Sequence, residues 1–582
     1  MLKILGAQVK EFKKDSFLTP VFMILEVLME TIIPLMMASI IDDGVEAGNI
    51  GHIYRIGVCM AAAACVSLFA GAMGGKFGAR ASAGFARNLR KAMYENIQTF
   101  SFSNIDKFST AGLVTRLTTD VTNMQNSYQM LLRMCVRAPI SLVCAMIMAF
   151  FISPKLACVY LIAVLGLGII LGFITVKAHH YFTQVFPKYD DLNGSVQENV
   201  SAIRVVKAYV REAYEKKKFT AASQSIYHMF VKAEGILAFN NPAMQITVYG
   251  CIIAISWLGA KMIVGGSLST GELMSLLTYC MNIMMSLMML SMVFVMLTMS
   301  VASAERICEV LKEKSDITDP ENPVREVADG SIAFEHVTFR YNKNAAKPVL
   351  NDVTLSIRSG ETIGIIGGTG SSKSSLVNLV SRLYDVSEGA VYVGGKDVRS
   401  YDLDTLRNEV SVVLQNNVLF SGTIYENLRW GDAQASDEEC KRACRLACAD
   451  EFIERFETGY HTYIEQGGAN VSGGQKQRLC IARALLKKPK ILILDDSTSA
   501  VDTATDAKIR RALLEEIPET TKLIIAQRIS SVQDADRIIV LNNGEVNGFG
   551  SHEELMKTNE IYRDVYESQT GGSGDFDEGG AA

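Results

Sequence analysis

The chain has 582 residues, of which 49% are apolar, and a formal net charge of -5 at pH 7. This length allows several domains, and the acidic balance argues against a nucleic-acid binder. The apolar surplus lies before residue 302, whereas the second half has the composition of an ordinary soluble domain. Twelve cysteines are scattered without a paired framework; Cys440, Cys444 and Cys448 fall four apart, a spacing that predicts one helix face rather than a zinc site.

The first half predicts a membrane domain. Residues 1–14 form a basic amphipathic segment that suits an interfacial helix. Six apolar runs then approach the length of about 20 residues that spans a bilayer as a helix. They lie at residues 17–41, 53–74, 137–152 with an upstream extension, 156–176, 244–264 and 273–301.

Charge between these runs predicts their orientation. The connection after the first run holds Asp42, Asp43 and Glu46, whereas the connections between runs two and three and between runs four and five are rich in Lys and Arg. The positive-inside rule places both basic connections, and both chain termini, in the cytoplasm of a plasma-membrane protein. The same two connections have helical rather than linker patterning.

Three features of the membrane domain are candidates for contact with a substrate. Glu26 and Glu30 are one helical turn apart in the first run, which fits either a cationic substrate or a structural bond to a neighbouring helix. Arg133 and Arg137 stand at the inner end of the third run, where snorkelling to the interface is expected. Methionines form a stripe in the last run that suits either a surface adaptable to varied shapes or plain helix packing. The stripe consists of Met281, Met285, Met288, Met292, Met296 and Met299.

The second half begins after a polar, proline-punctuated linker at residues 311–330. An alternating strand is predicted at 331–341, and a short apolar strand at 362–366 leads into the glycine-rich stretch 367–372 and a helix over 374–383. Such a turn directs backbone N–H groups at one point, at the positive end of a helix dipole, which suits a phosphate. Lys373 adds a charge for the β- and γ-phosphates, and the Ser374 hydroxyl can hold Mg²⁺. Ser372 departs from the pattern, which has glycine there.

Further landmarks follow in order. Strands are predicted at 410–414, ending at Gln415, at 491–496, ending in Asp495 and Asp496, and at 522–526, ending at Gln527. The segment 471–475 opens a helix over 476–486. Strands that alternate with helices around a phosphate loop predict an α/β sheet with its site at the carboxyl ends of the strands.

In the order and spacing of these motifs the chain resembles half-transporters of the ABC exporter family, in particular the degenerate-site subunit of a bacterial heterodimeric multidrug exporter. The resemblance implies that Tyr341 stacks on adenine, that 471–475 is the signature and that 499–502 is the D-loop. It implies contacts with ATP for Tyr341, Gly367, Gly368, Thr369, Gly370, Ser371, Ser372, Lys373, Ser374, Ser375, Gln415, Ser472, Gly473, Gly474 and Gln475. Mg²⁺ ligands are implied at Ser374, Gln415 and Asp495.

The chain departs from the family pattern in its hydrolytic groups. Asp496 stands where the family has a glutamate that polarises the attacking water, and its carboxylate is one methylene shorter. Gln527 replaces the switch histidine and cannot carry a proton charge. Gln466 stands where glutamate is usual, with Glu465 one place early, and Val471 replaces a leucine. Beside an intact signature, these changes predict a subunit that binds ATP, hydrolyses it poorly and completes the site of a second half-transporter.

The expected architecture is therefore an interfacial helix at 1–14, a six-helix transmembrane domain at 15–310, a linker at 311–330, an α/β P-loop ATPase domain at 331–568 and a flexible tail at 569–582. The expected function is ATP-driven export of an amphipathic or drug-like substrate. A slow homodimeric exporter of lipid or peptide, an ATP-gated channel or regulator, and an importer on the exporter fold remain alternatives.

Overall fold

The computed structural model describes residues 1–342, 345–497 and 500–570. Position 499 of the predicted D-loop and the tail at 571–582 lie outside these residues. The chain forms two compact units, one of residues 1–98 and 109–313, and one of residues 99–108 and 314–582. Each unit is described by itself.

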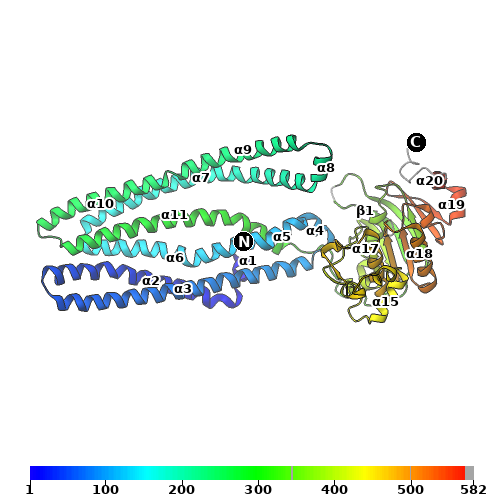
Figure 1. The fold of residues 1–582 in the computed structure, drawn as a ribbon, viewed down its shortest axis with the longest axis horizontal. Helices are drawn as coiled ribbons and strands as arrows, with labels where there is room; N and C mark the ends of the chain where they lie inside the picture. The colour runs from blue at the N-terminus through cyan, green and yellow to red at the C-terminus, as the bar shows by residue number, and fades with distance from the viewer. Residues whose placement is uncertain (343–344, 498–499, 571–582) are drawn as a thin grey trace. The chain divides into compact units, whose positions relative to one another are not determined.

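The first unit is helical, as the apolar runs predict (Figure 1). By length and composition, six helices among the described residues can cross a membrane. The bounds of the helices are α1 (Leu2–Ala7), α2 (Lys13–Ser39), α3 (Ile50–Gln98), α5 (Thr110–Thr115), α6 (Val121–Ile152), α7 (Pro154–Ser201), α8 (Ile203–Ala208), α9 (Glu212–Leu237), α10 (Asn240–Val264) and α11 (Thr270–Lys312).

The basic connections extend the membrane helices, as their helical patterning predicts. Helix α3 has 49 residues and α7 has 48, so each continues well beyond the length that a bilayer needs. Helix α2 packs along α3, α6 along α11, and α7 along α9 (Figure 1). Helix α11 reaches Lys312, two residues beyond the predicted boundary at 310.

Small residues allow close approach between the first helices. A Cβ built on Gly84 of α3 would lie 2.3 Å from the Phe12 ring, and one on Gly74 would lie 2.3 Å from the methyl carbon of Met23. The Arg87 guanidinium lies over the same Phe12 ring, 5.3 Å from its centroid. The N-terminal segment is thereby held against α3.

The second unit contains a four-stranded antiparallel sheet in the order β2-β1-β4-β5 and a six-stranded sheet in the order β12-β11-β3-β10-β9-β6. The strands are β1 (Ile332–Phe339), β2 (Leu350–Ile357), β3 (Thr362–Ile366), β4 (Glu388–Val393), β5 (Lys396–Asp397), β6 (Val410–Val413), β7 (Gly422–Thr423), β8 (Tyr463–Ile464), β9 (Ile491–Asp495), β10 (Thr521–Ile525), β11 (Arg537–Asn542) and β12 (Glu545–Gly550). The predicted α/β class is confirmed, and every residue of β3, β9 and β10 is buried.

The helices of the second unit cover these sheets. They are α4 (Phe102–Phe108), α12 (Lys373–Val380), α13 (Leu403–Glu409), α14 (Ile424–Leu428), α15 (Asp437–Leu446), α16 (Asp450–Ile453), α17 (Gly473–Leu486), α18 (Thr503–Glu516), α19 (His552–Thr558) and α20 (Glu560–Thr570). Cys440 and Cys444 lie on α15 and are buried in an apolar core with Cys448 and Cys480. The prediction that all three cysteines share one helix face is wrong for Cys448, which lies beyond the end of α15 with a φ of +50°.

An ion pair between a buried carboxylate, just before α6, and a half-exposed arginine of α11 leads to a prediction about stability. Asp120 is almost fully buried; its Oδ2 accepts from Arg306 Nε at 2.7 Å and its Oδ1 accepts from Ser303 Oγ at 2.9 Å. Arg306→Met should lower the free energy of unfolding by about 3 kcal/mol, because it leaves a buried carboxylate without its counter-charge. Thermal unfolding of the detergent-solubilised chain measures this.

The double variant Asp120→Leu/Arg306→Met should recover most of that loss, since removing both charges leaves none uncompensated. The matched control is Lys91→Met, which breaks an exposed pair with Glu95 and should cost less than about 1 kcal/mol. Equal losses in Arg306→Met and the double variant would contradict the assignment of the effect to the buried charge.

Candidate functional site

Five strands of the six-stranded sheet run parallel, and four of them, β3, β10, β9 and β6, lead into the loops of the candidate site. Strand β10 pairs in parallel with β3 and β9, and β9 pairs in parallel with β6. Ile525 of β10 lies opposite Ile365 on one side and Asp495 on the other. The loops that follow these strands therefore meet, and they carry the predicted phosphate loop, Asp495, Asp496, Gln415 and Gln527.

The phosphate loop leaves β3 and turns sharply into α12. Gly370 has a φ of +86°, and Ser372 is left-handed as well, with a φ of +74°. A Cβ on Gly367 would lie 2.4 Å from both the Leu541 carbonyl oxygen and Ser371 Oγ, so only glycine fits there. Lys373 Nζ donates to the carbonyl oxygens of Gly367 and Gly368 at 2.6 and 2.9 Å, which brings its charge to the concave side of the turn.

Asp495 and Ser374 lie together beside this loop. Asp495 is 5% exposed and accepts a hydrogen bond from the Ser374 side chain. Burial raises the pKa of Asp495, whereas this hydrogen bond and the charge of Lys373 act in the opposite direction. A buried carboxylate beside a hydroxyl is a donor set that a hard divalent cation prefers.

The two departures in the hydrolytic groups lie in contact. Asp496 Oδ2 accepts from Gln527 Nε2 at 3.1 Å and from Gln415 Nε2 at 3.4 Å. Asp496 has a φ of +47°, and its backbone N–H donates to the Ile525 carbonyl oxygen at 3.2 Å. The structure thus brings Asp496, Gln415 and Gln527 to one point, where both amides donate to the same carboxylate oxygen.

Two further residues that the sequence did not single out support these groups. Gln569 of α20 donates from Nε2 to the Gln527 carbonyl oxygen at 3.0 Å and accepts from the Ile529 N–H at 2.9 Å. Tyr384 packs edge-to-face on Tyr341 with ring centroids 5.0 Å apart, and its hydroxyl donates to Asp106 of α4 at 3.0 Å. Burial and this carboxylate raise the pKa of Tyr384, so its hydroxyl stays a donor. No local motif marks either residue, because both act through tertiary contacts.

Tyr341 presents a ring surface near the phosphate loop. It is 49% exposed, and its hydroxyl lies 2.9 Å from Ser375 Oγ. Phe339 packs against the same ring with centroids 4.8 Å apart. An aromatic face held in this way is suited to stacking on a base.

The signature segment forms the start of α17. Ser472 is the N-cap: its Oγ accepts from the Gln475 N–H at 3.3 Å, and its N–H donates to Gln475 Oε1 at 2.9 Å. A Cβ on Gly474 would lie 2.7 Å from the Ala500 carbonyl oxygen. Ser472 and Gly473 are exposed, so the N-terminus of a 14-residue helix is open to an anion.

In the membrane unit, the structure corrects the interpretation of Arg137 as a snorkelling residue. Arg137 Nη1 donates to Glu26 Oε1 at 2.8 Å, and Nη2 donates to the two oxygens of Glu30 at 2.9 and 3.0 Å. The charge-assisted hydrogen bonds to two carboxylates stabilise the guanidinium more than hydration at the membrane interface would. The structural bond that the sequence left open for Glu26 and Glu30 is therefore present.

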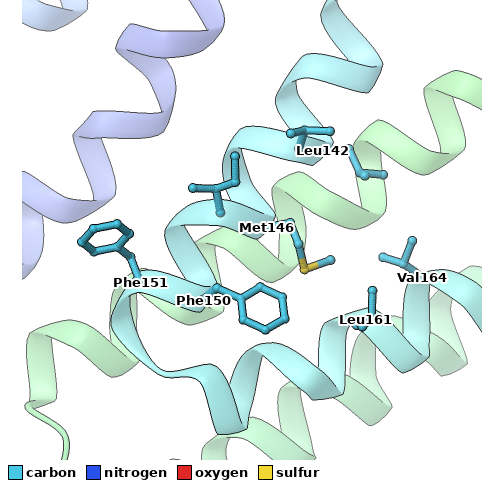
Figure 2. Close-up of a pocket in the computed structure, with 8 residues that line it drawn as sticks. Leu142, Met146, Phe150, Phe151, Leu161 and Val164 are labelled. Carbon is cyan, nitrogen blue, oxygen red and sulfur yellow. The ribbon is translucent and has the colours of Figure 1, made fainter.

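The methionine stripe is partly open. The four predicted contacts Met281, Met285, Met288 and Met292 are exposed along α11, whereas Met284 is buried among them. The side chain of Met299 lies outside the described set. An additional apolar hollow of about 510 Å³ lies between α6 and α7, away from these residues (Figure 2). Its lining includes Leu142, Met146, Phe150, Phe151, Leu161 and Val164; none is charged, so no charge pattern in the sequence marks it.

The helical unit, and the sheet edge at which the phosphate loop meets Asp495, together define a membrane domain joined to a P-loop ATPase domain. The ABC transporter transmembrane region matches residues 16–304, and the ABC transporter ATPase family matches residues 350–499. The chain belongs to the ABC transporter family, and its ATPase domain binds ATP and couples hydrolysis to transport.

Several relatives cover nearly the whole chain. It is 36% identical to the uncharacterized ABC transporter ATP-binding protein YfiB of Bacillus subtilis, over 97% of this chain and 99% of that protein. It is 35% identical to Rv1273c of Mycobacterium tuberculosis over 98% of both chains, and 31% identical to a fatty acid ABC transporter ATP-binding/permease protein of Mycobacterium bovis over 81% of this chain and 75% of that protein. The structure of a bacterial Atm1-family ABC exporter with ATP bound has the same fold, with a TM-score of 0.83 at 23% identity over 96% of this chain and 99% of that one.

The left-handed backbone of Ser372 leads to a prediction about the stability of the phosphate loop. A left-handed residue with a side chain is strained by roughly 1–2 kcal/mol, and glycine removes most of that strain. Ser372→Gly should therefore raise the free energy of unfolding of the ATPase domain by about 0.5 kcal/mol after the loss of backbone entropy is counted. Thermal unfolding of the full chain reports the change.

The reverse exchange at the other left-handed position is the matched control. Gly370→Ser places a side chain at a φ of +86° and should lower the free energy of unfolding by about 1 kcal/mol. A loss of stability in Ser372→Gly would show that the serine side chain stabilises the loop through contacts that outweigh its strain.

Proposed function

We propose that this chain is one subunit of an ATP-driven exporter whose own Walker site binds ATP and hydrolyses it poorly. The observation that carries the proposal is the group around Asp496. One oxygen of a short carboxylate accepts from both the Gln527 and the Gln415 amide, and neither amide can take up a proton. General-base action needs a carboxylate within reach of the attacking water, and the missing methylene shortens that reach.

In this proposal the remaining parts of the site bind nucleotide. Tyr341 offers its face to adenine, the N–H groups of the 367–375 loop and Lys373 hold the phosphates, and Ser374, Gln415 and Asp495 hold Mg²⁺. The ion, when bound, neutralises phosphate charge. Asp495 suits that role because it is buried beside Ser374 and Lys373 of the same site.

The partner in this proposal is a second, different half-transporter. The exposed N-cap Ser472 and the amides of Gly473 and Gly474 supply an anion site on α17, and in a dimer they complete the partner's nucleotide site. The basic connections place both termini and both ATPase domains in the cytoplasm, with the six spans in the plasma membrane. The substrate is amphipathic or drug-like, and Glu26, Glu30, Met281, Met285, Met288 and Met292 are its proposed contacts.

The ATPase rate of the dimer distinguishes the two proposed roles of this chain, which are to bind ATP at its own Walker site and to complete the partner's site with Ser472. Ser472→Ala should lower the ATPase rate of the purified pair at least about 10-fold, because it removes a contact to the partner's competent site. Asp496→Ala should change the same rate less than about 3-fold, since general-base losses of about 10²–10⁴-fold arise only at a site that turns over. A steady-state phosphate-release assay measures both.

A gain of function serves as the control. Asp496→Glu together with Gln527→His should raise the ATPase rate of the chain purified without its partner at least about 10-fold, because both restore hydrolytic groups. If Asp496→Ala abolishes turnover of the pair while Ser472→Ala is harmless, the degenerate site is excluded and a slow homodimer takes its place.

The direction of transport is tested in inside-out vesicles that contain the pair. A labelled amphipathic substrate should accumulate in the lumen when MgATP is added outside, because the ATPase domains then face the nucleotide. Uptake should require the phosphate-loop lysines, and the control combines Lys373→Ala in this chain with the same exchange at the phosphate-loop lysine of the partner. Passive flux on ATP binding would indicate a gated channel instead, and movement out of the lumen would indicate an importer.

A further inference from the structure

The side chain of Gln569 holds the backbone that follows strand β10. Its Nε2 donates to the Gln527 carbonyl oxygen at 3.0 Å, and its Oε1 accepts from the Ile529 N–H at 2.9 Å. One planar amide therefore pairs with a carbonyl and with an N–H of the same short segment, so it restrains the direction of both groups. We call residues 527–531 the switch segment, and Gln569 fixes its start.

Helix α18 holds the other end of the switch segment. Arg510 donates from Nη1 to the Ser530 carbonyl oxygen at 3.1 Å, and Ser531 Oγ donates to Asp506 Oδ2 at 3.2 Å. Both bonds lie three or four residues after Gln527. Two helices thus share the segment, and the contact that reaches the backbone of Gln527 comes from α20.

Helix α20 is packed firmly enough to give this glutamine a fixed origin. Tyr562 and Val565 of α20 are buried in the same apolar core as Ile529 and Val532. Gln569 follows Val565 by one helical turn, on the same face of the helix. The amide is therefore presented to the switch segment by a helix that is itself anchored beside that segment.

The side chain of Gln527 reaches the nucleotide edge of the sheet. Its Nε2 donates to Asp496 Oδ2 at 3.1 Å, and a glutamine amide has a second N–H that can donate to a phosphate oxygen. In the proposed function the γ-phosphate of ATP lies at this place, because Asp496 stands where a carboxylate polarises the attacking water. ADP lacks this phosphate, so a donor held here favours ATP over ADP.

We propose that Gln569 is a positioning residue for Gln527: it holds the backbone of the switch segment so that the Gln527 amide faces the γ-phosphate of ATP. Helix α20 thereby sets how strongly this site prefers ATP to ADP. The inference rests on the proposed function, because it requires ATP in the Walker site of this chain.

The test compares two nucleotides, each with Mg²⁺, on the purified full chain in lipid nanodiscs. The probes are ADP and AMP-PNP, an ATP analogue whose γ-phosphate is not released, and titration calorimetry gives both dissociation constants. Gln527→Ala should weaken AMP-PNP binding about 10-fold, because it removes a hydrogen bond to a charged group. Gln569→Met, which has nearly the same shape, should weaken it at least about 3-fold, since the Gln527 amide is no longer aimed. ADP binding should stay within about 2-fold in both variants.

A double variant distinguishes positioning from a general structural role. Because Gln569 acts through Gln527, the variant Gln527→Ala/Gln569→Met should bind AMP-PNP within about 2-fold of Gln527→Ala alone. Gln569→Glu keeps an acceptor for the Ile529 N–H but loses the donor to the Gln527 carbonyl oxygen, so it should bind AMP-PNP no better than Gln569→Met. The matched control is Gln533→Met, at an exposed glutamine just after the switch segment, which should bind both nucleotides as wild type does.

The contrary results overturn the inference in different ways. Additive losses in the double variant, or equal losses for AMP-PNP and ADP in Gln569→Met, would show that Gln569 only supports the fold. Full recovery in Gln569→Glu would assign the effect to Ile529 and not to Gln527. Wild-type binding by Gln569→Met would overturn this inference alone, whereas rapid phosphate release from ATP by the wild-type chain would overturn the poorly hydrolysing site and leave the role of Gln569 standing.

Discussion

The parallel pairing of β3, β10, β9 and β6 is the constraint on which the nucleotide site depends. Strands that run parallel end at one edge, so loops that are far apart in the sequence are brought together without any contact of their own. Every residue of β3, β9 and β10 is buried, as expected for parallel strands that are covered on both faces of the sheet. Asp496, Gln415 and Gln527 meet only because their strands do.

The membrane unit obeys a different constraint, the cost of charge in an apolar surrounding. Its helices carry few ionisable groups among the apolar runs, and two arginines in or beside these runs bond acids of other elements. Arg137 satisfies two carboxylates at once, and Arg306 satisfies Asp120 beside Ser303. These bonds connect helices that are distant in the chain, so each charged group also fixes which helices lie together.

Local patterns and the resemblance to ABC exporters were sufficient for the class of each domain. Strand β3 has the predicted bounds, and β6, β9, β10 and α12 differ from the prediction by one to three residues at an end. Contacts between side chains on different helices could not be predicted from these local patterns. The snorkelling interpretation of Arg137 was wrong because spacing along α6 shows that an arginine is near the membrane edge but not which carboxylate faces it. Tyr384 and Gln569 were missed for the same reason.

The sequence by itself determined six apolar helices long enough to span a membrane and a P-loop ATPase domain. These follow from periodicity, run length and side-chain chemistry, which are local properties, whereas the interpretation of Asp496 and Gln527 as departures in the hydrolytic groups came from the resemblance to ABC exporters. Only the tertiary structure decided that both amides hold the Asp496 carboxylate, that Tyr384 supports Tyr341, and that Glu26 and Glu30 share Arg137. Each of these depends on the distance between side chains on different elements, which packing fixes and a single sequence does not encode locally.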